Sequence, residues 1–127
     1  MATTVLLIDD SDIFRTRMRR RLQEEPEFTI VEARNGFEGL IAIEKTRPDA
    51  VLLDLHMPGM DGFTVLGEIR ERFNALKVIV LSANLTEASR QRCVELGAET
   101  LIDKTDAALA VVPAIHRACE TGMEEGA

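Results

Sequence analysis

The segment VLLDLHMPGMDG, Val51 to Gly62, decides the fold of this 127-residue chain more than any other stretch. It opens with three apolar residues that show no polar alternation, a pattern typical of a parallel strand covered on both faces of its sheet. The strand closes on Asp54, and Pro58, Gly59 and Gly62 then mark a turn-rich loop. We therefore expect a buried strand here that presents one carboxylate at its C-terminal end.

Four further apolar runs alternate with amphipathic stretches along the chain. We expect strands at residues 5–8, 28–31, 77–81 and 100–102, with a helix after each strand. Alternating strands and helices predict an α/β fold, a flavodoxin-like (βα)5 doubly wound parallel sheet with helices on both faces. In such sheets ligands bind at the edge formed by the C-terminal ends of the strands.

The helices should start at polar caps and bury one apolar stripe each. Asn35 is expected to cap the second helix, with Glu38 completing a capping box. Pro113 predicts either a kink in the last helix or a start only near Val112, and Gly122 is expected to stop it. In the second helix the expected buried stripe consists of Phe37, Leu40 and Ile41, which Ile43 would extend. In the last helix it consists of Leu109, Val112, Ile115 and Cys119.

Composition and charge narrow the function classes. With 46% apolar residues, the chain should fold as one domain at 1–120, followed by a flexible acidic C-terminal tail at 121–127. The formal net charge of -7 argues against direct binding of nucleic acid or of an anionic membrane. Cys93 and Cys119 lack metal-ligand spacing, and with no signal peptide or apolar span they indicate a reducing, cytoplasmic location.

Polar residues stand within two positions of the end of four of the expected strands. They are Asp9 and Asp10, then Asp54, Ser82 and Lys104. Each one alone is better explained as a helix cap or a solvated loop group. Together they fall at the same end of their strands, where converging carboxylates repel each other unless a hard cation shares the site. A Mg²⁺ pocket beside a lysine and a hydroxyl suits phosphoryl chemistry.

In these residues the chain resembles the receiver domain of the two-component response-regulator family. The segments that match in order and spacing are Asp9-Asp10, ARNG at 33–36, VLLDLHMPGMDG at 51–62, SA at 82–83 and GAETLIDK at 97–104. The resemblance extends to about Cys119 and implies the strand order 2-1-3-4-5. It implies partners as well: a sensor histidine kinase or phosphotransfer protein, and a downstream protein or output domain.

The resemblance also implies roles for single residues. Asp54 would accept a phosphoryl group from a phosphohistidine, Ser82 would bond a phosphoryl oxygen, and Lys104 would pair with the Asp54 carboxylate. The implied Mg²⁺ ligands are Asp10, Asp9 largely through water, Asp54, and the backbone carbonyl of His56. Such a chain would be no enzyme beyond catalysing its own phosphorylation and dephosphorylation.

Several positions depart from the family pattern or have two interpretations. Leu101 stands where the family usually has an aromatic switch residue, and Thr105 where it often has a proline after a cis bond, so we expect a trans Lys104–Thr105 bond. His56 and Asn84 either tune the phosphoryl lifetime or are solvated loop side chains. The arginines of the first helix are expected to form a solvated face, with kinase docking as the weaker alternative: Arg15, Arg17, Arg19, Arg20 and Arg21.

Three other functions compete with a phosphorylated receiver. A flavodoxin-like cofactor carrier would need a phosphate-cradling loop after the first strand, where Asp9 and Asp10 would repel phosphate. An aspartyl-phosphate phosphatase would want a second acid at the position of His56. A degenerate receiver that acts only as a docking module is disfavoured because the acidic pair, Asp54 and Lys104 are all present.

Overall fold

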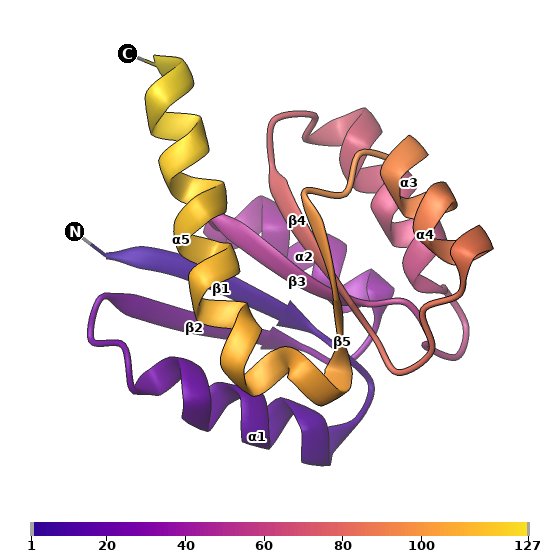
Figure 1. Ribbon diagram of the computed structural model, residues 1–127, viewed down its shortest axis with the longest axis horizontal. Coiled ribbons are helices and arrows are strands. Elements are labelled where there is room, and N and C mark those ends of the chain that lie inside the picture. The colour runs from indigo at the N-terminus through magenta and orange to yellow at the C-terminus, as the bar shows by residue number, and fades with distance from the viewer. Residues whose placement is uncertain (1, 127) are drawn as a thin grey trace.

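A twisted parallel sheet forms the centre of the molecule (Figure 1). The computed structural model describes the backbone of residues 2–126 and the side chains of residues 2–120. Within this part of the chain the sheet has five strands in the order β2-β1-β3-β4-β5, all pairs parallel, which confirms the predicted fold and strand order. The strands are β1 (Thr3–Ile8), β2 (Phe28–Ala33), β3 (Ala50–Asp54), β4 (Lys77–Ser82) and β5 (Thr100–Asp103).

Helices cover both faces of this sheet. They are α1 (Asp12–Gln23), α2 (Gly36–Thr46), α3 (Gly62–Arg72), α4 (Glu87–Glu95) and α5 (Ala107–Gly126), with a short 3₁₀ turn, η1 (Lys104–Asp106), before the last. One core lies between the sheet and α1 and α5, and a second between the sheet and α2, α3 and α4. Within β1, Val5 and Leu7 point into the first core while Leu6 and Ile8 point into the second, which explains why the strand is apolar without alternation.

The helix caps agree with the sequence except at α2. Ser11 caps α1, and Thr86 caps α4 in a reciprocal capping box with Ser89. Asn35 caps α2, accepting a hydrogen bond from the Glu38 backbone N–H at 2.9 Å. The Glu38 carboxylate, however, accepts from the backbone N–H of Arg34 and not from that of Asn35, so the predicted capping box is incomplete.

The predicted buried face of α2 is wrong in part. Leu40 and Ile43 are buried, but Phe37 and Ile41 are 63% and 54% exposed. The reason is a close approach of α2 to β1: a Cβ added to Gly39 would lie 2.5 Å from Ile8 Cδ1. The helix therefore turns its glycine side towards the sheet, and this rotation carries Phe37 and Ile41 out to solvent.

The predictions for the last helix also need correction. Leu109 is 85% exposed, and α5 buries Val111 and Ile115 along with Val112. The helix begins at Ala107 because η1 turns the chain immediately after β5, and this early start fixes which face meets the sheet. Pro113 lies exposed inside the helix, so a start near Val112 is excluded.

The C-terminal end of α5 departs from the sequence prediction too. The described helix continues to Gly126, so Gly122 does not stop it, because a single glycine is tolerated within a helix at a cost of about 1 kcal/mol. That residues 121–127 form a flexible acidic tail stays a prediction, and Ala127 lies outside the described residues. Over residues 2–126 no peptide bond is cis, as expected for Lys104–Thr105, and no helix has the length and apolar character needed to cross a membrane.

Candidate functional site

The strand register brings the predicted polar residues to one edge of the sheet. Ile8 pairs with Leu53, so Asp9 and Asp54 each lie one residue beyond neighbouring partners. On the other side, Asp54 pairs with Leu81 and Ser82 pairs with Asp103. The C-terminal ends of four strands therefore contribute side chains to one site, at the edge where open α/β sheets bind ligands.

Asp54 is the centre of this site and is only 3% exposed. Burial raises the pKa of its carboxyl group to about 6, and the nearby charge of Asp9 adds to the rise. The positive charge of Lys104 and the backbone N–H of His56, which donates to Asp54 Oδ1 at 3.3 Å, oppose it. The His56 N–H and Lys104 thus hold the Asp54 carboxylate in place, but they do not fully offset the effects of burial and of Asp9 on its pKa.

Lys104 lies between two of the acids rather than on Asp54 alone. Its Nζ is 2.7 Å from Asp9 Oδ2 and 3.5 Å from Asp54 Oδ1. The same ammonium lies 4.2 Å from the ring centroid of Phe14, a cation–π distance that fixes it from the α1 side. The pairing with Asp54 expected from the resemblance is present, and the closer partner is Asp9.

The three carboxylates Asp9, Asp10 and Asp54 each offer an oxygen, and these oxygens lie within 4.8 Å of one another. Asp9 is fully buried, and its Oδ2 has the Lys104 ion pair but no hydrogen bond. Asp10 is exposed and opens the cluster to solvent. A hard, oxygen-seeking divalent cation such as Mg²⁺ fits this donor set, because it would satisfy the orphaned oxygen and offset the repulsion among the acids. The contribution of the His56 carbonyl stays a prediction.

Ser82 is fully buried at the end of β4. Its Oγ accepts a hydrogen bond from the backbone N–H of Asn84 at 3.1 Å, so the hydroxyl already holds the start of the β4–α4 loop. A new hydrogen bond to the Ser82 hydroxyl would therefore also displace the start of the β4–α4 loop. The side chains of Asn84 and His56 are exposed beside the site, where both of their interpretations remain open.

The loop after Asp54 packs tightly over the end of β3. Gly62 N donates to Leu55 O at 2.9 Å, and a Cβ at Gly62 would lie 2.4 Å from Leu55 Cα and 2.5 Å from Asp54 O. Asp61 then caps α3 by accepting from Thr64 N. Only a glycine allows α3 to start this close to the acceptor strand.

Thr105 explains how this chain does without the usual proline. Its backbone N–H and its hydroxyl both donate to Asp103 Oδ1, at 2.9 and 2.8 Å, so Asp103 caps η1, which starts at Lys104. A proline has no N–H to donate there. Leu101, in the aromatic position, is half-buried against the core formed with α2, α3 and α4.

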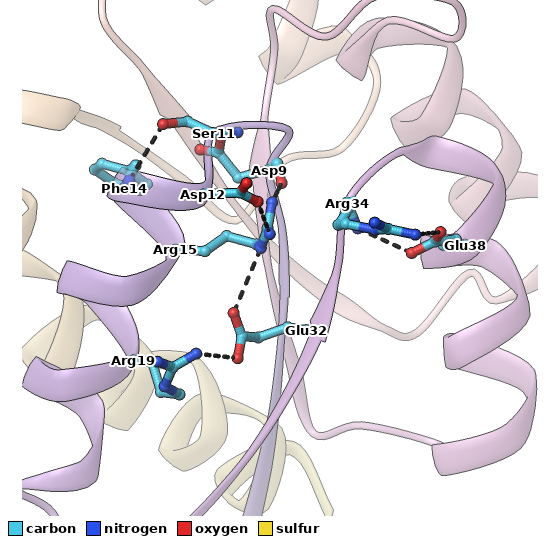
Figure 2. Close-up of polar contacts among 9 residues, drawn as sticks. All are labelled: Asp9, Ser11, Asp12, Phe14, Arg15, Arg19, Glu32, Arg34 and Glu38. Carbon is cyan, nitrogen blue, oxygen red and sulfur yellow. Dashed lines mark hydrogen bonds and ion pairs between the residues drawn. The ribbon is translucent and has the colours of Figure 1, made fainter.

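Sequence reasoning missed the role of Arg15, which it placed on a solvated face. The Arg15 side chain is only 10% exposed and contacts Asp9, Asp12 and Glu32 (Figure 2). The available signal was its phase on α1, because Arg15, Met18 and Leu22 fall on one buried stripe. Arg17 and Arg20 are exposed as expected.

Comparisons with known proteins agree on one family. The family model of the response regulator receiver domain matches residues 5–116. Among curated proteins, the nitrate/nitrite response regulator protein NarL of Escherichia coli (strain K12) is 34% identical over 121 residues, 94% of this chain and 56% of that protein. The sensor histidine kinase CheAY of Helicobacter pylori is 39% identical over 104 residues, 79% of this chain and 13% of that protein. The chain thus spans little more than half of the first relative and a small part of the second.

Solved structures show the same architecture. A two-component response regulator of the LuxR family from Aurantimonas sp. SI85-9A1 superposes with a TM-score of 0.89 at 26% identity, covering 95% of this chain and 87% of that one. A CheY-like receiver domain protein from Methanospirillum hungatei JF-1 gives a TM-score of 0.91 at 19% identity, covering 98% and 99%. The second likeness bears on the fold alone.

Proposed function

Since the chain belongs to the response regulator receiver domain family of two-component signalling, we propose that it accepts a phosphoryl group on Asp54 and switches partner binding in response. The observation that carries this proposal is the state of Asp54. Its carboxylate is buried, has a raised pKa, lies 3.5 Å from Lys104 Nζ, and shares a cluster with two other carboxylates. A cation shared by the three carboxylates would relieve their mutual repulsion and would stabilise the charge of an incoming phosphoryl group.

The phosphoryl donor would be a phosphohistidine of a sensor kinase or phosphotransfer protein. An Asp54 oxygen forms the new P–O bond while the P–N bond to the histidine breaks, and the imidazole nitrogen keeps the electron pair and takes a proton. Mg²⁺ held by Asp9, Asp10, Asp54 and the His56 carbonyl would offset charge on the phosphoryl oxygens. Lys104 can pair with the same phosphoryl oxygens, since its ammonium already lies between Asp9 and Asp54.

Dephosphorylation is a separate reaction, the hydrolysis of the acyl phosphate. Water attacks phosphorus, the bond to Asp54 breaks, and inorganic phosphate leaves. His56 and Asn84 flank the site with exposed side chains, and we include in the proposal that they set how fast this water arrives. The chain would then act on no substrate except its own phosphoryl group.

The kinase-facing surface in this proposal is the exposed side of α1. Arg17 and Arg20 are exposed there, and Ile13 is exposed beside them, so the surface is basic and apolar although the whole chain carries a net charge of -7. It adjoins the site through Phe14, whose ring touches Lys104. The proposal includes a cytoplasmic location, supported by the free cysteines Cys93 and Cys119, and an output protein or domain whose chemistry follows from the switch.

Mass spectrometry tests the acceptor. After incubation with acetyl phosphate and Mg²⁺, the wild-type protein should gain about 80 Da as one labile phosphoryl group, and Asp54→Asn should gain none. Asp61→Asn is the matched control, because Asp61 lies in the same loop but caps α3. Labelling of Asp54→Asn to the wild-type level would disprove the assignment.

A further inference from the structure

The chain between β1 and α1 is held by a buried arginine that the proposed chemistry does not use. Arg15 Nη1 donates to the backbone carbonyl oxygen of Asp9 at 2.7 Å. Its other guanidinium nitrogens contact two carboxylates: Nη2 contacts Asp12 Oδ1, and Nε lies 3.4 Å from Glu32 Oε1. Figure 2 shows the guanidinium between the turn after β1 and the side chain from β2.

Burying the Arg15 guanidinium costs free energy, and the contacts around it have to offset that cost. A buried guanidinium loses its hydration and is stable only with several acceptors around it. An apolar side chain at this position would fill the same stripe as Met18 and Leu22 without that cost. Glu32 is itself held on its far oxygen by Arg19 Nη1 at 2.7 Å, so the acceptor opposite Arg15 is fixed as well.

The carbonyl that Arg15 holds lies between two acids of the carboxylate cluster, Asp9 and Asp10. Asp9 O belongs to the peptide group shared with Asp10, and the planarity of that group fixes the direction in which the Asp10 Cα leaves it. The rest of Asp9 is restrained too, because its N–H donates to Ala33 O at 3.1 Å and its Oδ1 accepts from Ser11 N at 2.8 Å. Asp10 is exposed and has no such restraints of its own on its side chain among the described contacts.

We propose that Arg15 is a positioning residue for the metal site: its buried guanidinium holds the Asp9–Asp10 peptide group so that both carboxylates face Asp54. Glu32 acts one step further away by orienting Arg15. This inference rests on the proposed function, in which Asp9, Asp10 and Asp54 take Mg²⁺. Groups that orient metal ligands without touching the metal commonly matter about tenfold or more for its affinity.

A matched pair of substitutions on α1 separates positioning from general packing. Arg15→Lys keeps the charge but loses the fork that reaches Asp9 O and Glu32 together. Arg19→Lys makes the same change one turn later, on a residue that shares Glu32 but does not touch Asp9. Mg²⁺ affinity is measured by titration, following the backbone amide shifts of Asp10 and Ser11, and the free energy of unfolding of each variant is measured in EDTA.

Arg15→Lys should weaken Mg²⁺ binding about tenfold or more, while Arg19→Lys should stay within about twofold of wild type. With acetyl phosphate, the Mg²⁺ concentration for half-maximal labelling should rise in Arg15→Lys by the same factor, and labelling at saturating Mg²⁺ should return to the wild-type rate. A purely structural Arg15 would instead lower stability in EDTA and leave the Mg²⁺ affinity unchanged, and that result would overturn the proposal.

Three further outcomes are decisive. If Arg15→Lys does not fold, Glu32→Gln takes its place, because it leaves Arg15 intact and removes the charge that orients it; unchanged Mg²⁺ affinity in Glu32→Gln would then overturn the inference. If the wild-type protein itself fails to bind Mg²⁺, the metal-dependent function fails and this inference with it. If wild type binds and both arginine variants bind equally well, only the inference fails.

Discussion

The surroundings of Asp54 act on its pKa in opposite directions. Burial and the neighbouring Asp9 favour its protonated form, while Lys104 and the His56 N–H favour its ionised form. The outcome is a pKa of about 6, well above the ordinary value of 3.8. A carboxylate in this condition gains from any added positive charge, which is what the site needs if metal and phosphoryl group are to bind there together.

The sign of this shift predicts how Asp54 affects stability. Because the folded pKa is raised, the folded state binds the proton more tightly than the unfolded state, and stability is lost as pH rises from about 4 to about 6. In EDTA at pH 7, Asp54→Asn should therefore be more stable than wild type by about 3 kcal/mol, and the gain should vanish near pH 4. Urea denaturation at several pH values measures it.

Asp61→Asn provides a control of opposite sign. The hydrogen bond from Thr64 N lowers the pKa of the Asp61 carboxyl group, so its contribution to stability is present above the unfolded pKa and is lost as pH falls. This variant should be less stable than wild type at pH 7. A gain for Asp54→Asn that is the same at pH 4 and pH 7 would contradict the origin assigned to the Asp54 pKa.

Single residues were predictable where their role depends on local order in the chain. Asp54, Ser82 and Lys104 each follow or end a strand, so an apolar run and its last residue were enough to place them. For Arg15 the helix phase indicated burial, but its acceptor Glu32 comes from β2 and has no local signature. The contact of Phe14 with Lys104 joins α1 to the start of η1, and it too has no local signature.

At the scale of elements, the existence of each helix was easier to predict than the face it buries. On α2 an apolar stripe at helical spacing pointed to Phe37 and Ile41, yet the close approach at Gly39 selects a neighbouring face. Hydrophobic periodicity reports which residues could face a core, whereas backbone separation decides which ones do. The strands were predicted better because every side of the central ones is buried, so no face had to be chosen.

The junction between β3 and α3 gives a prediction at this scale. Gly62 and Gly67 both lie in α3, but a Cβ at Gly62 would meet backbone atoms of Asp54 and Leu55, while one at Gly67 would meet nothing within 4 Å. Gly67→Ala should stabilise the protein by about 1 kcal/mol through helix propensity. Gly62→Ala should destabilise it by about 3 kcal/mol, because backbone must move to admit the methyl group.

Chemical denaturation of the two variants provides the test, and labelling by acetyl phosphate adds a functional readout. Gly62→Ala should also slow labelling of Asp54, since the displaced atoms include the Asp54 carbonyl, whereas Gly67→Ala should label like wild type. Equal stability of the two variants would show that the β3–α3 loop is not packed as closely as described.

For the whole molecule, one helix, α4, is attached to the sheet less firmly than the other described helices. Of the described helices, α4 buries only Cys93, and its neighbour β5 is the shortest strand at four residues. In contrast, α1 and α5 share a continuous core with β1, β3 and β4. Ser82 lies where the firm part meets the loose one, at the end of a fully buried strand and hydrogen-bonded to the loop that leads to α4.

This asymmetry predicts where a phosphoryl group would be felt. A beryllium fluoride mimic bound with Mg²⁺ at Asp54 offers Ser82 an acceptor that only the activated state contains, and Lys104 holds the other side, so the β4–α4 loop should shift. Because Leu101 cannot act as an aromatic switch, the response should spread through α4, β5 and the start of α5. Backbone amide shifts should therefore be large across residues 83–110 and small in α2.

Ser82→Ala should still bind the mimic but lose most of the shifts in α4, since the β4–α4 loop then gains no new hydrogen bond. Shifts confined to α1 and α2, with residues 83–101 silent, would show that the switch takes another route through the fold.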